Sequence, residues 1–415
     1  MRTTGKFVTD STVTPQAQSF VPKPLPPDPP LELTAEDYDL IDRANLALGR
    51  LDGLTTLLPD TNLLIYMYVR KEAVLSSQIE GTVSSLEDLL VHESKDAPGV
   101  PAIDDTQEVV NYVLAIEHGL KLSKTKNLPI AGRLLKETHR VLLNKGRGAS
   151  KEPGEYRRNL VRIGGTGFAD ASFIPPPAAY VADAMADLER FLNDQPVRTP
   201  TLLKAALAHV QFETIHPFRD GNGRLGRLLI TLLLCAERVL RQPTLYLSLY
   251  FKTHRQTYYD KLQRVRTDGD WEGWVRFFLQ GVLTTATKAD ELARAMLKLF
   301  DTHRRQLEGT GRQSSSALRV HHFMQRKPIF SIPQAAAATK LTQPTVWAVI
   351  NTMKTLRLVR ELSEYKHPRL FSYGPYIRLL SEQTMEEEPS EAGPILRTES
   401  EPLSATAFAV GDKLR

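Results

Sequence analysis

Residues 216–227 read HPFRDGNGRLGR, and the rest of the chain is interpreted outward from this stretch. His216 titrates near neutral pH, which suits a general base. Asp220 offers the carboxylate oxygen that Mg²⁺ prefers and normally shares with substrate phosphates. Gly221 and Gly223 let the backbone turn tightly, so that bare N–H groups point at an anion. These residue types together predict a site that holds and attacks a nucleotide phosphate.

The apolar run Leu225–Leu240 follows this turn and predicts a buried helix. A glycine turn that leads into a helix N-terminus is a ready-made phosphate site, because the first N–H groups of a helix lack intrahelical partners. Arg224 and Arg227 lie three residues apart, close to one face of the first turn. Both guanidinium groups are therefore expected to reach phosphate oxygens.

The pattern His-x-Phe-x-Asp-Gly-Asn-Gly-Arg-x-x-Arg resembles the signature of the Fic family, whose members transfer AMP from ATP to protein hydroxyl groups. Every specified position is matched between His216 and Arg227. A related phosphotransferase branch tends to carry Lys at the position of Gly223, so Gly223 favours AMP transfer. The resemblance implies that His216 is catalytic and that Asp220 holds Mg²⁺. It further implies that ATP is bound by Gly221, Asn222, Gly223, Arg224, Leu225, Gly226 and Arg227.

A second motif lies upstream, at the end of a helix expected from about Thr61 to Glu80. Ser76 and Glu80 are four residues apart and therefore share a helix face, and Gly81 suits a C-terminal cap. Residues 76–81 resemble the family's inhibitory motif, Ser/Thr-x-x-x-Glu-Gly/Asn. The resemblance implies that Glu80 pairs with Arg227 and denies it to the ATP γ-phosphate. A capped helix end with a solvated acid would show the same pattern.

Residues 156–177 change from helical to alternating periodicity around a glycine-rich turn, which predicts a β-hairpin. In the Fic family, a hairpin flap at this place lines the nucleotide pocket and holds the target segment by strand addition. The helix expected at Thr253–Val265 resembles the one whose tyrosines line the adenine pocket, with Tyr258 and Tyr259 as candidates, either of which could instead be a core residue. His139 is expected to be a packed helix histidine.

The predicted fold is mainly α, a Fic-type helical bundle with a β-hairpin flap, followed by a small winged helix-turn-helix domain. Four segments are expected. Residues 1–32 are a disordered Pro-rich N-terminus lying partly on the surface, and 33–308 form the Fic domain. Residues 314–381 form the winged helix-turn-helix, with Gln343–Leu356 as recognition helix, and 382–415 are a disordered acidic tail. The winged helix could contact DNA, or it could serve protein interaction or dimerisation.

Composition narrows the class of protein. The 415 residues carry 53 Lys and Arg against 48 Asp and Glu, a net charge of +5, which does not by itself imply a nucleic-acid partner. Cys235 is the single cysteine, so an internal disulfide is excluded and a cytoplasmic setting is favoured. The N-terminus does not resemble a signal peptide. The longest apolar run is shorter than the roughly 20 residues that span a bilayer, so no membrane association is expected.

The expected function is transfer of AMP from ATP to Tyr, Ser or Thr hydroxyls of protein targets and of the chain itself. The same cradle is equally compatible with removal of AMP from a modified protein, with Glu80 helping to activate water. A third reading is a DNA-binding regulator whose Fic domain senses nucleotide. Family members often dimerise, so a homodimer is possible here.

Overall fold

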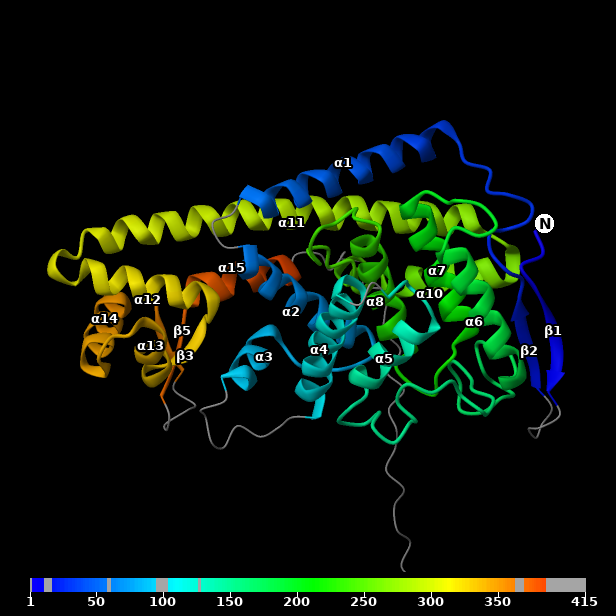
Figure 1. Cartoon of the computed structure of the whole chain (residues 1–415), viewed down its shortest axis with the longest axis horizontal. Coiled ribbons are helices and arrows are strands. Elements are labelled where there is room, and N and C mark those ends of the chain that lie inside the picture. Colours follow the sequence, from blue (N-terminus) through cyan, green and yellow to red (C-terminus); the bar gives the residue numbers. More distant parts are fainter. Residues whose placement is uncertain are drawn as a thin grey trace, which may run out of the picture.

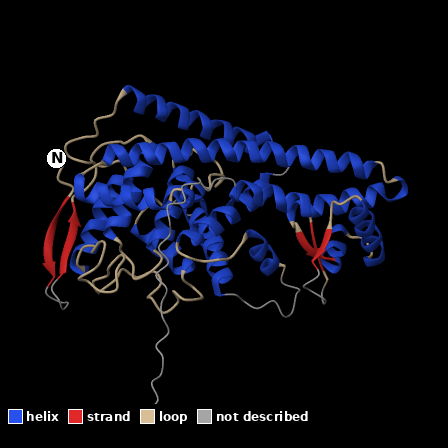
Figure 2. Cartoon of the chain, turned by 180° about the vertical axis from the view of Figure 1, so that it is seen from behind, coloured by secondary structure: helices blue, strands red, loops and turns tan. Residues whose placement is uncertain are grey.

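The computed structural model describes residues 2–10, 17–57, 61–94, 104–125, 128–362 and 369–385. These residues are mostly helical, and the few strands lie at opposite ends of the molecule (Figure 2). The mainly α fold class is therefore confirmed. Among the described residues, no helix is both long and apolar enough to cross a membrane.

Two long helices run side by side along one edge of the molecule (Figure 1). They are α1 (Ala35–Leu57) and α11 (Trp271–Glu308). Thr34 and Asp37 cap the start of helix α1: the Thr34 N–H donates to Asp37 Oδ2 at 2.9 Å, and the Asp37 N–H donates to Thr34 Oγ1 at 3.4 Å. The Asp37 carboxylate also accepts from Arg276 of α11 at 2.6 Å. This hydrogen bond lowers the pKa of Asp37 to about 2 and ties the two helices together.

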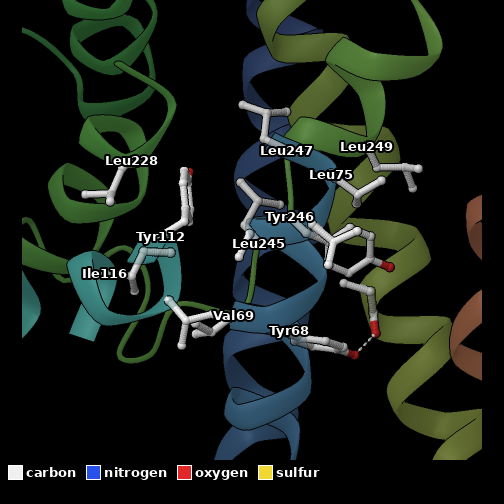
Figure 3. Close-up of a cluster of buried hydrophobic side chains, with 14 of the residues drawn as sticks. Tyr68, Val69, Leu75, Tyr112, Ile116, Leu228, Leu245, Tyr246, Leu247 and Leu249 are labelled. Carbon is white, nitrogen blue, oxygen red and sulfur yellow. Dashed lines mark hydrogen bonds between the residues drawn. The ribbon is translucent and has the colours of Figure 1, made fainter. Parts of the chain in front are cut away.

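Beneath this pair lies the body of the bundle. Its helices are α2 (Thr61–Ile79), α3 (Leu86–Glu93), α4 (Asp104–Thr125), α5 (Gly132–Leu142), α6 (Ala178–Leu192), α7 (Thr201–Ile215), α8 (Asn222–Ala236), α9 (Ser248–Thr253) and α10 (Arg255–Asp268). Figure 3 shows side chains of α2, α4 and α8 meeting in the core. The buried Tyr68 hydroxyl donates to the carbonyl of Ala289 at 2.6 Å, which fastens α2 to α11. Residues 216–227 thus lead into a helix that is buried on nearly all sides.

The prediction of disorder for residues 1–32 is wrong for the described part of that segment. Strands β1 (Gly5–Asp10) and β2 (Ala17–Pro22) form an antiparallel hairpin. The Phe20 N–H donates to the carbonyl of Ile174 at 3.0 Å, and Arg2 pairs with Glu272 at 3.0 Å. The Phe20 side chain is buried. The described part of the segment is ordered because the helical body supplies hydrogen-bond partners and an apolar surface for it. The polar composition of the segment alone gives no sign of these contacts.

The flap is present but is not the regular hairpin that was predicted for residues 156–177. Only one bridge forms, between Ile163 and Phe173. The loop between them closes on itself: Asp170 accepts from the N–H groups of Thr166 and Gly167 at 2.8 and 2.6 Å. These local side-chain bonds satisfy the backbone in place of a strand ladder. In the described part of the chain before the C-terminal module, the regular strands are β1 and β2 of the N-terminal hairpin, not strands of the flap.

The C-terminal module begins at α12 (Ser314–Arg326), at the first residue of the segment expected for it. It continues with β3 (Ile329–Ser331), α13 (Ile332–Thr339), α14 (Gln343–Thr355), β4 (Arg360–Leu362), β5 (Leu370–Ser372) and α15 (Gly374–Met385). The sheet order is β3-β5-β4, with both pairs antiparallel. Ser331 and Thr342 cap α13 and α14, as the sequence indicated. The module lies at the end of α11 opposite the N-terminal hairpin (Figure 1). Its assignment as a winged helix-turn-helix stays a prediction.

The tail prediction for 382–415 is corrected at its start, since α15 extends to Met385. Residues from 386 onward lie outside the described residues.

Candidate active site

The site is built on the turn between α7 and α8. His216 ends α7 in the left-handed conformation, with φ 49° and ψ 61°, and its N–H still bonds to the carbonyl of Phe212. Gly221 precedes α8 with φ 75°, a conformation that costs glycine little. The first hydrogen bond of α8 runs from the Leu225 N–H to the carbonyl of Gly221 at 2.9 Å. The backbone N–H groups of residues 222–224 therefore stand at an open helix N-terminus, as predicted.

The turn is held from inside by Asn222. Its side chain accepts from the Phe218 N–H and donates to the Phe218 carbonyl, both at 2.9 Å. The predicted contact of the Asn222 side chain with phosphate is therefore replaced, in this structure, by a role in shaping the loop. Its backbone N–H keeps the predicted position.

His139 holds the same turn from outside. It is buried, as predicted, and stacks on Phe218 with ring centroids 3.8 Å apart. The Gly154 N–H donates to Nδ1 at 2.8 Å, so the proton sits on Nε2 and is donated to the carbonyl of Asp220 at 2.9 Å. Burial lowers the pKa of His139 to about 4, which keeps the ring neutral for this purpose. No local sequence signal reveals this partnership.

Arg157 joins the flap segment to the catalytic histidine. Its Nε donates to the carbonyl of His216 at 2.8 Å, and its second terminal nitrogen donates to the carbonyl of Pro176 at 2.6 Å. The Arg157 N–H donates to the carbonyl of Pro217 at 2.9 Å. The sequence alone gives no sign of this role for Arg157.

His216 faces a pocket of about 540 Å³. Burial, with the nearby charges of Arg157 and Arg266, lowers the pKa of His216 to about 3. The imidazole is therefore neutral at physiological pH, the state required of a base. The pocket is lined by Glu80, Ile163, Gly164, Ser172, Phe173, Glu213, His216, Gly223, Arg227, Arg255, Gln256, Tyr258, Tyr259, Asp260, Leu262, Gln263 and Arg266. Elements far apart in sequence thus meet around the histidine.

The predicted pairing of Glu80 with Arg227 is present. Arg227 donates to Glu80 Oε1 at 2.6 Å, to Ser76 Oγ at 2.8 Å and to the Ser76 carbonyl at 3.0 Å. Burial raises the pKa of Glu80, but the Arg227 charge and hydrogen bond outweigh it and hold that pKa below the usual range. A Cβ on Gly223 would lie 2.3 Å from Glu80 Oε1. Glycine at this position therefore makes room for the Glu80 carboxylate.

Arg224 is buried and already paired. It donates to Glu108 Oε2 of α4 at 3.0 Å and lies 3.5 Å from Asp220 Oδ1. Glu108 in turn accepts from Arg147 at 2.6 Å. The guanidinium is fixed at the helix N-terminus, where phosphate binding requires it, although Glu108 was not anticipated.

Three of the predicted nucleotide-binding residues also pack within the bundle, and their part in nucleotide binding stays a prediction. The Leu225 side chain is buried and its N–H is used within α8. A Cβ on Gly226 would lie 2.6 Å from Glu213 Oε1, so Gly226 permits close packing of α7 and α8. Tyr258 lines the pocket but is 1% exposed, and its hydroxyl lies 2.8 Å from His209 Nε2. The more exposed Tyr259 lines the same pocket.

Asp220 meets the requirements of a shared metal ligand. Its side chain is 39% exposed, and Oδ1 accepts from the Gly221 N–H at 2.6 Å. Among the described residues, no group of three or more His, Cys, Asp or Glu could hold a metal ion by itself. A single carboxylate that shares Mg²⁺ with substrate phosphates is the arrangement such sites commonly use, so the residues present fit the ion.

Residues 38–121 match the family model described as Fic/DOC family N-terminal, and residues 129–234 match that of the Fic/DOC family. The protein adenylyltransferase Fic of Culex quinquefasciatus is 35% identical over 201 residues, covering 48% of this chain and 37% of that protein. Its namesake from Aedes aegypti is 33% identical over 225 residues, covering 52% of this chain and 42% of that one. The match thus spans less than half the length of these relatives.

Among solved structures, a Fic family protein from Desulfovibrio desulfuricans G20 is similar with a TM-score of 0.54 and 22% sequence identity. The match covers 83% of this chain and 97% of that chain, which shows a shared fold. With the intact signature at 216–227, the matches show that residues 38–121 and 129–234 are the N-terminal domain and the Fic domain of the Fic/DOC family.

Proposed function

We propose that this chain transfers AMP from ATP to a Tyr, Ser or Thr hydroxyl of protein targets, its own residues included. The observation that carries the proposal is the pocket where His216, the open N-terminus of α8 and Arg227 meet. Relatives named protein adenylyltransferase Fic support the same reaction.

In the proposed reaction, His216 takes the proton of the target hydroxyl, and the freed oxygen attacks the α-phosphorus of ATP. Charge that develops on the phosphate is met by the backbone N–H groups of residues 222–224. Arg224 and Arg227 hold the β- and γ-phosphates so that pyrophosphate leaves in line. Positioning and electrostatics supply most of the rate enhancement, and proton transfer adds about 10²- to 10⁴-fold.

Asp220 is the residue that would hold Mg²⁺ with the phosphates. The ion supplies positive charge against the phosphate oxygens when bound. Arg224, 3.5 Å from Asp220 Oδ1, keeps that carboxylate beside the helix N-terminus.

Glu80 is proposed to be inhibitory, because it occupies the guanidinium that the γ-phosphate needs. Arg227 donates to Glu80 and to two oxygens of Ser76. All three acceptors lie in one segment, whereas Arg224, the other buried arginine of α8, contacts Glu108 and Asp220 in two separate segments. Removal of the Glu80 carboxylate frees one N–H of Arg227 Nη2, while the bonds to Ser76 keep the guanidinium in place.

Removal of AMP from a modified protein is a second candidate function. Glu80 and His216 line the same pocket, so the carboxylate lies where it could activate water.

Further proposals concern partners: the flap holds the target segment, and the C-terminal module acts as a winged helix. Residues 317–360 hold seven Lys or Arg and no acid, which suits duplex DNA, whereas a protein partner or homodimer is the alternative. A cytoplasmic setting remains part of the proposal.

The test is incubation of the full chain with Mg²⁺ and ATP labelled in the α- or, separately, the γ-phosphate. Wild type, Glu80→Gly and His216→Ala are compared by label on protein. The expected result is α-label only, strongest in Glu80→Gly and absent in His216→Ala. Label from the γ-position would show a phosphotransferase instead. If neither form of labelled ATP labels the protein, removal of AMP from a modified protein becomes the function to test next.

A further inference from the structure

Glu213 is a buried carboxylate of the active site that the signature does not include. It belongs to the last turn of α7, three residues before His216. It is 6% exposed and lines the nucleotide pocket. Its place on the same turn as the catalytic histidine gives it direct access to the imidazole.

Two buried side-chain atoms in this turn make no hydrogen bond of regular geometry, although the Glu213 backbone carbonyl also faces the His216 imidazole. They are Glu213 Oε1 and His216 Nδ1. The other carboxylate oxygen, Glu213 Oε2, lies 3.9 Å from His216 Nδ1. Buried polar atoms are nearly always paired, and catalytic hydrogen bonds are often long before substrate binds. The two groups are therefore natural partners for each other.

Helix α8 confines the carboxylate beside the histidine. A Cβ on Gly226 would lie 2.6 Å from Glu213 Oε1 and 3.2 Å from the Phe212 ring. The glycine of the catalytic stretch thus leaves a space that Glu213 fills. Ordinary packing of two helices would not require a charged group there.

We propose that Glu213 is the positioning residue of His216: its carboxylate accepts a hydrogen bond from Nδ1–H and so keeps Nε2 unprotonated and free to act on the target hydroxyl. This inference rests on the AMP transfer proposed above. A shift of about 1 Å in the Glu213 side chain brings Oε2 to hydrogen-bond distance of Nδ1.

The proton balance of the step is simple. The hydroxyl O–H bond breaks, its proton forms a bond to Nε2, and the oxygen forms a bond to the α-phosphorus as the bond to pyrophosphate breaks. His216 becomes an imidazolium with Nδ1–H directed at the Glu213 carboxylate, and Nε2 later returns its proton to water. Glu213 stays ionised throughout and stabilises the cation.

The charge state of Glu213 depends on every element packed against it. The facing groups are Arg227 of α8, Arg266 and Tyr258 of α10, Glu80 after α2, Arg157 of the flap segment and His216 itself. Burial raises the pKa of Glu213 to about 7, although Arg227 opposes the rise. The carboxylate therefore ionises as the pH rises through about 7, and its support of His216 appears only above that pH.

The first experiment follows His216 by imidazole ¹⁵N NMR in the full chain with labelled histidine. The His216 resonances are identified by their loss in His216→Ala. At pH 8.5 the proton is expected on Nδ1, and its resonance should shift with a midpoint near pH 7 as Glu213 protonates. Glu213→Gln should abolish that titration. An unprotonated Nδ1 at pH 8.5, or the same titration in Glu213→Gln, overturns the proposal. No AMP transfer is needed for this readout, so it stands even if the proposed reaction is wrong.

The second experiment measures kcat and KM for ATP against pH in a Glu80→Gly background. At pH 8, Glu213→Gln should lower kcat about 10- to 100-fold and leave KM within about twofold. The ratio of parental to Glu213→Gln kcat should rise with pH as Glu213 ionises, at a lower pH than in wild type, because the Glu80 charge that helps to raise the pKa of Glu213 is absent from this background. Using the ratio removes the titration of ATP itself.

Two further variants complete the design. Glu213→Asp keeps a carboxylate and should keep a pH-dependent ratio at a lower maximum rate, which a packing role would not produce. Glu72→Gln is the matched control, because Glu72 is buried with a pKa raised by burial to about 7 but bonds Ser248 and lies outside the pocket lining. It should leave the parental pH profile unchanged. A pH-independent ratio, or a kcat unaffected in Glu213→Gln, overturns the proposal. If Glu213→Gln does not fold, the wild-type NMR titration decides the question.

Discussion

At the residue scale, backbone contacts fix the position of His216, and Nε2 is the ring nitrogen proposed to act as the base. Its left-handed conformation and the Arg157 bond to its carbonyl do not depend on the imidazole. We therefore expect His216→Ala to lose AMP transfer by at least about 10²- to 10⁴-fold while keeping its fold. ATP affinity by calorimetry should stay within about threefold, and the unfolding midpoint should stay close to that of wild type. Retained transfer, or loss of folding, would contradict this account.

Gly223 provides a second residue-scale prediction. In Gly223→Ala, the new methyl would lie 2.3 Å from Glu80 Oε1, so the carboxylate must leave Arg227. ATP should then bind more tightly than to wild type. In a double-mutant cycle with Glu80→Gly, the two changes should be non-additive, because both remove the same contact. Calorimetry of the four proteins makes the comparison, and additive effects would show that Gly223 acts independently of Glu80.

The resemblance to the family's inhibitory motif predicted the Glu80–Arg227 pair, but nothing in the sequence predicted the residues that anchor the turn. The signature and inhibitory motifs are local patterns, so each could be recognised where it stands. His139 and Asp220 are 81 residues apart, and Glu108 and Arg224 are 116 apart. A single sequence gives no periodic or compositional sign of such long-range pairs. Asn222 was assigned to phosphate, whereas its amide bonds the backbone of Phe218 at both ends.

At the element scale, the flap segment and the catalytic turn form one hydrogen-bonded unit through Arg157. Arg157→Lys keeps the charge but loses the planar fork that reaches the carbonyls of His216, Asn159 and Pro176. Buried carbonyls left without donors cost about 1–3 kcal/mol. We expect a lower unfolding midpoint and a kcat reduced about tenfold or more. Arg158→Lys, at the exposed neighbouring position, is the matched control and should behave as wild type in both assays.

Element boundaries agree with the sequence where a capping residue marks the start of a helix. They differ from it where tertiary contacts determine the local structure. Thr34, Ser331 and Thr342 begin helices as their cap chemistry indicates. The alternating residues of the flap predicted two strands, but Asp170 satisfies the loop backbone locally. The Pro-rich N-terminus lacks the composition of a folded segment. Its described residues are ordered because the Ile174 carbonyl of the flap accepts a hydrogen bond from the Phe20 N–H, and because the Phe20 ring is buried.

At the scale of the whole molecule, the C-terminal module is fastened to α11 by a buried tyrosine. The Tyr373 hydroxyl lies 2.6 Å from His303 Nδ1 of α11 and 3.0 Å from His321 Nε2 of α12. Burial lowers the pKa of His321 to about 4 and also lowers that of His303. Both rings are neutral in the folded chain at neutral pH.

This arrangement predicts an acid-sensitive stability. An unfolded histidine protonates near pH 6.5, whereas folded His321 does so near pH 4, so its contribution is complete above about 6.5 and is lost as the pH falls toward 4. The unfolding midpoint of wild type should therefore exceed that of His321→Gln more at pH 7.5 than at pH 4.5, by about 2–4 °C. Scanning calorimetry at the two pH values is the measurement. An equal difference at both would show that His321 does not titrate on unfolding.

The central claim is that the Fic site adds AMP to protein and that Glu80 restrains it. Intact-protein mass spectrometry after incubation with ATP and Mg²⁺ tests this claim most directly, comparing wild type, Glu80→Gly and Glu80→Gly/His216→Ala. We predict added masses of whole AMP groups in Glu80→Gly, fewer in wild type and none in the double variant. An added phosphate, or equal modification of wild type and Glu80→Gly, would contradict the account.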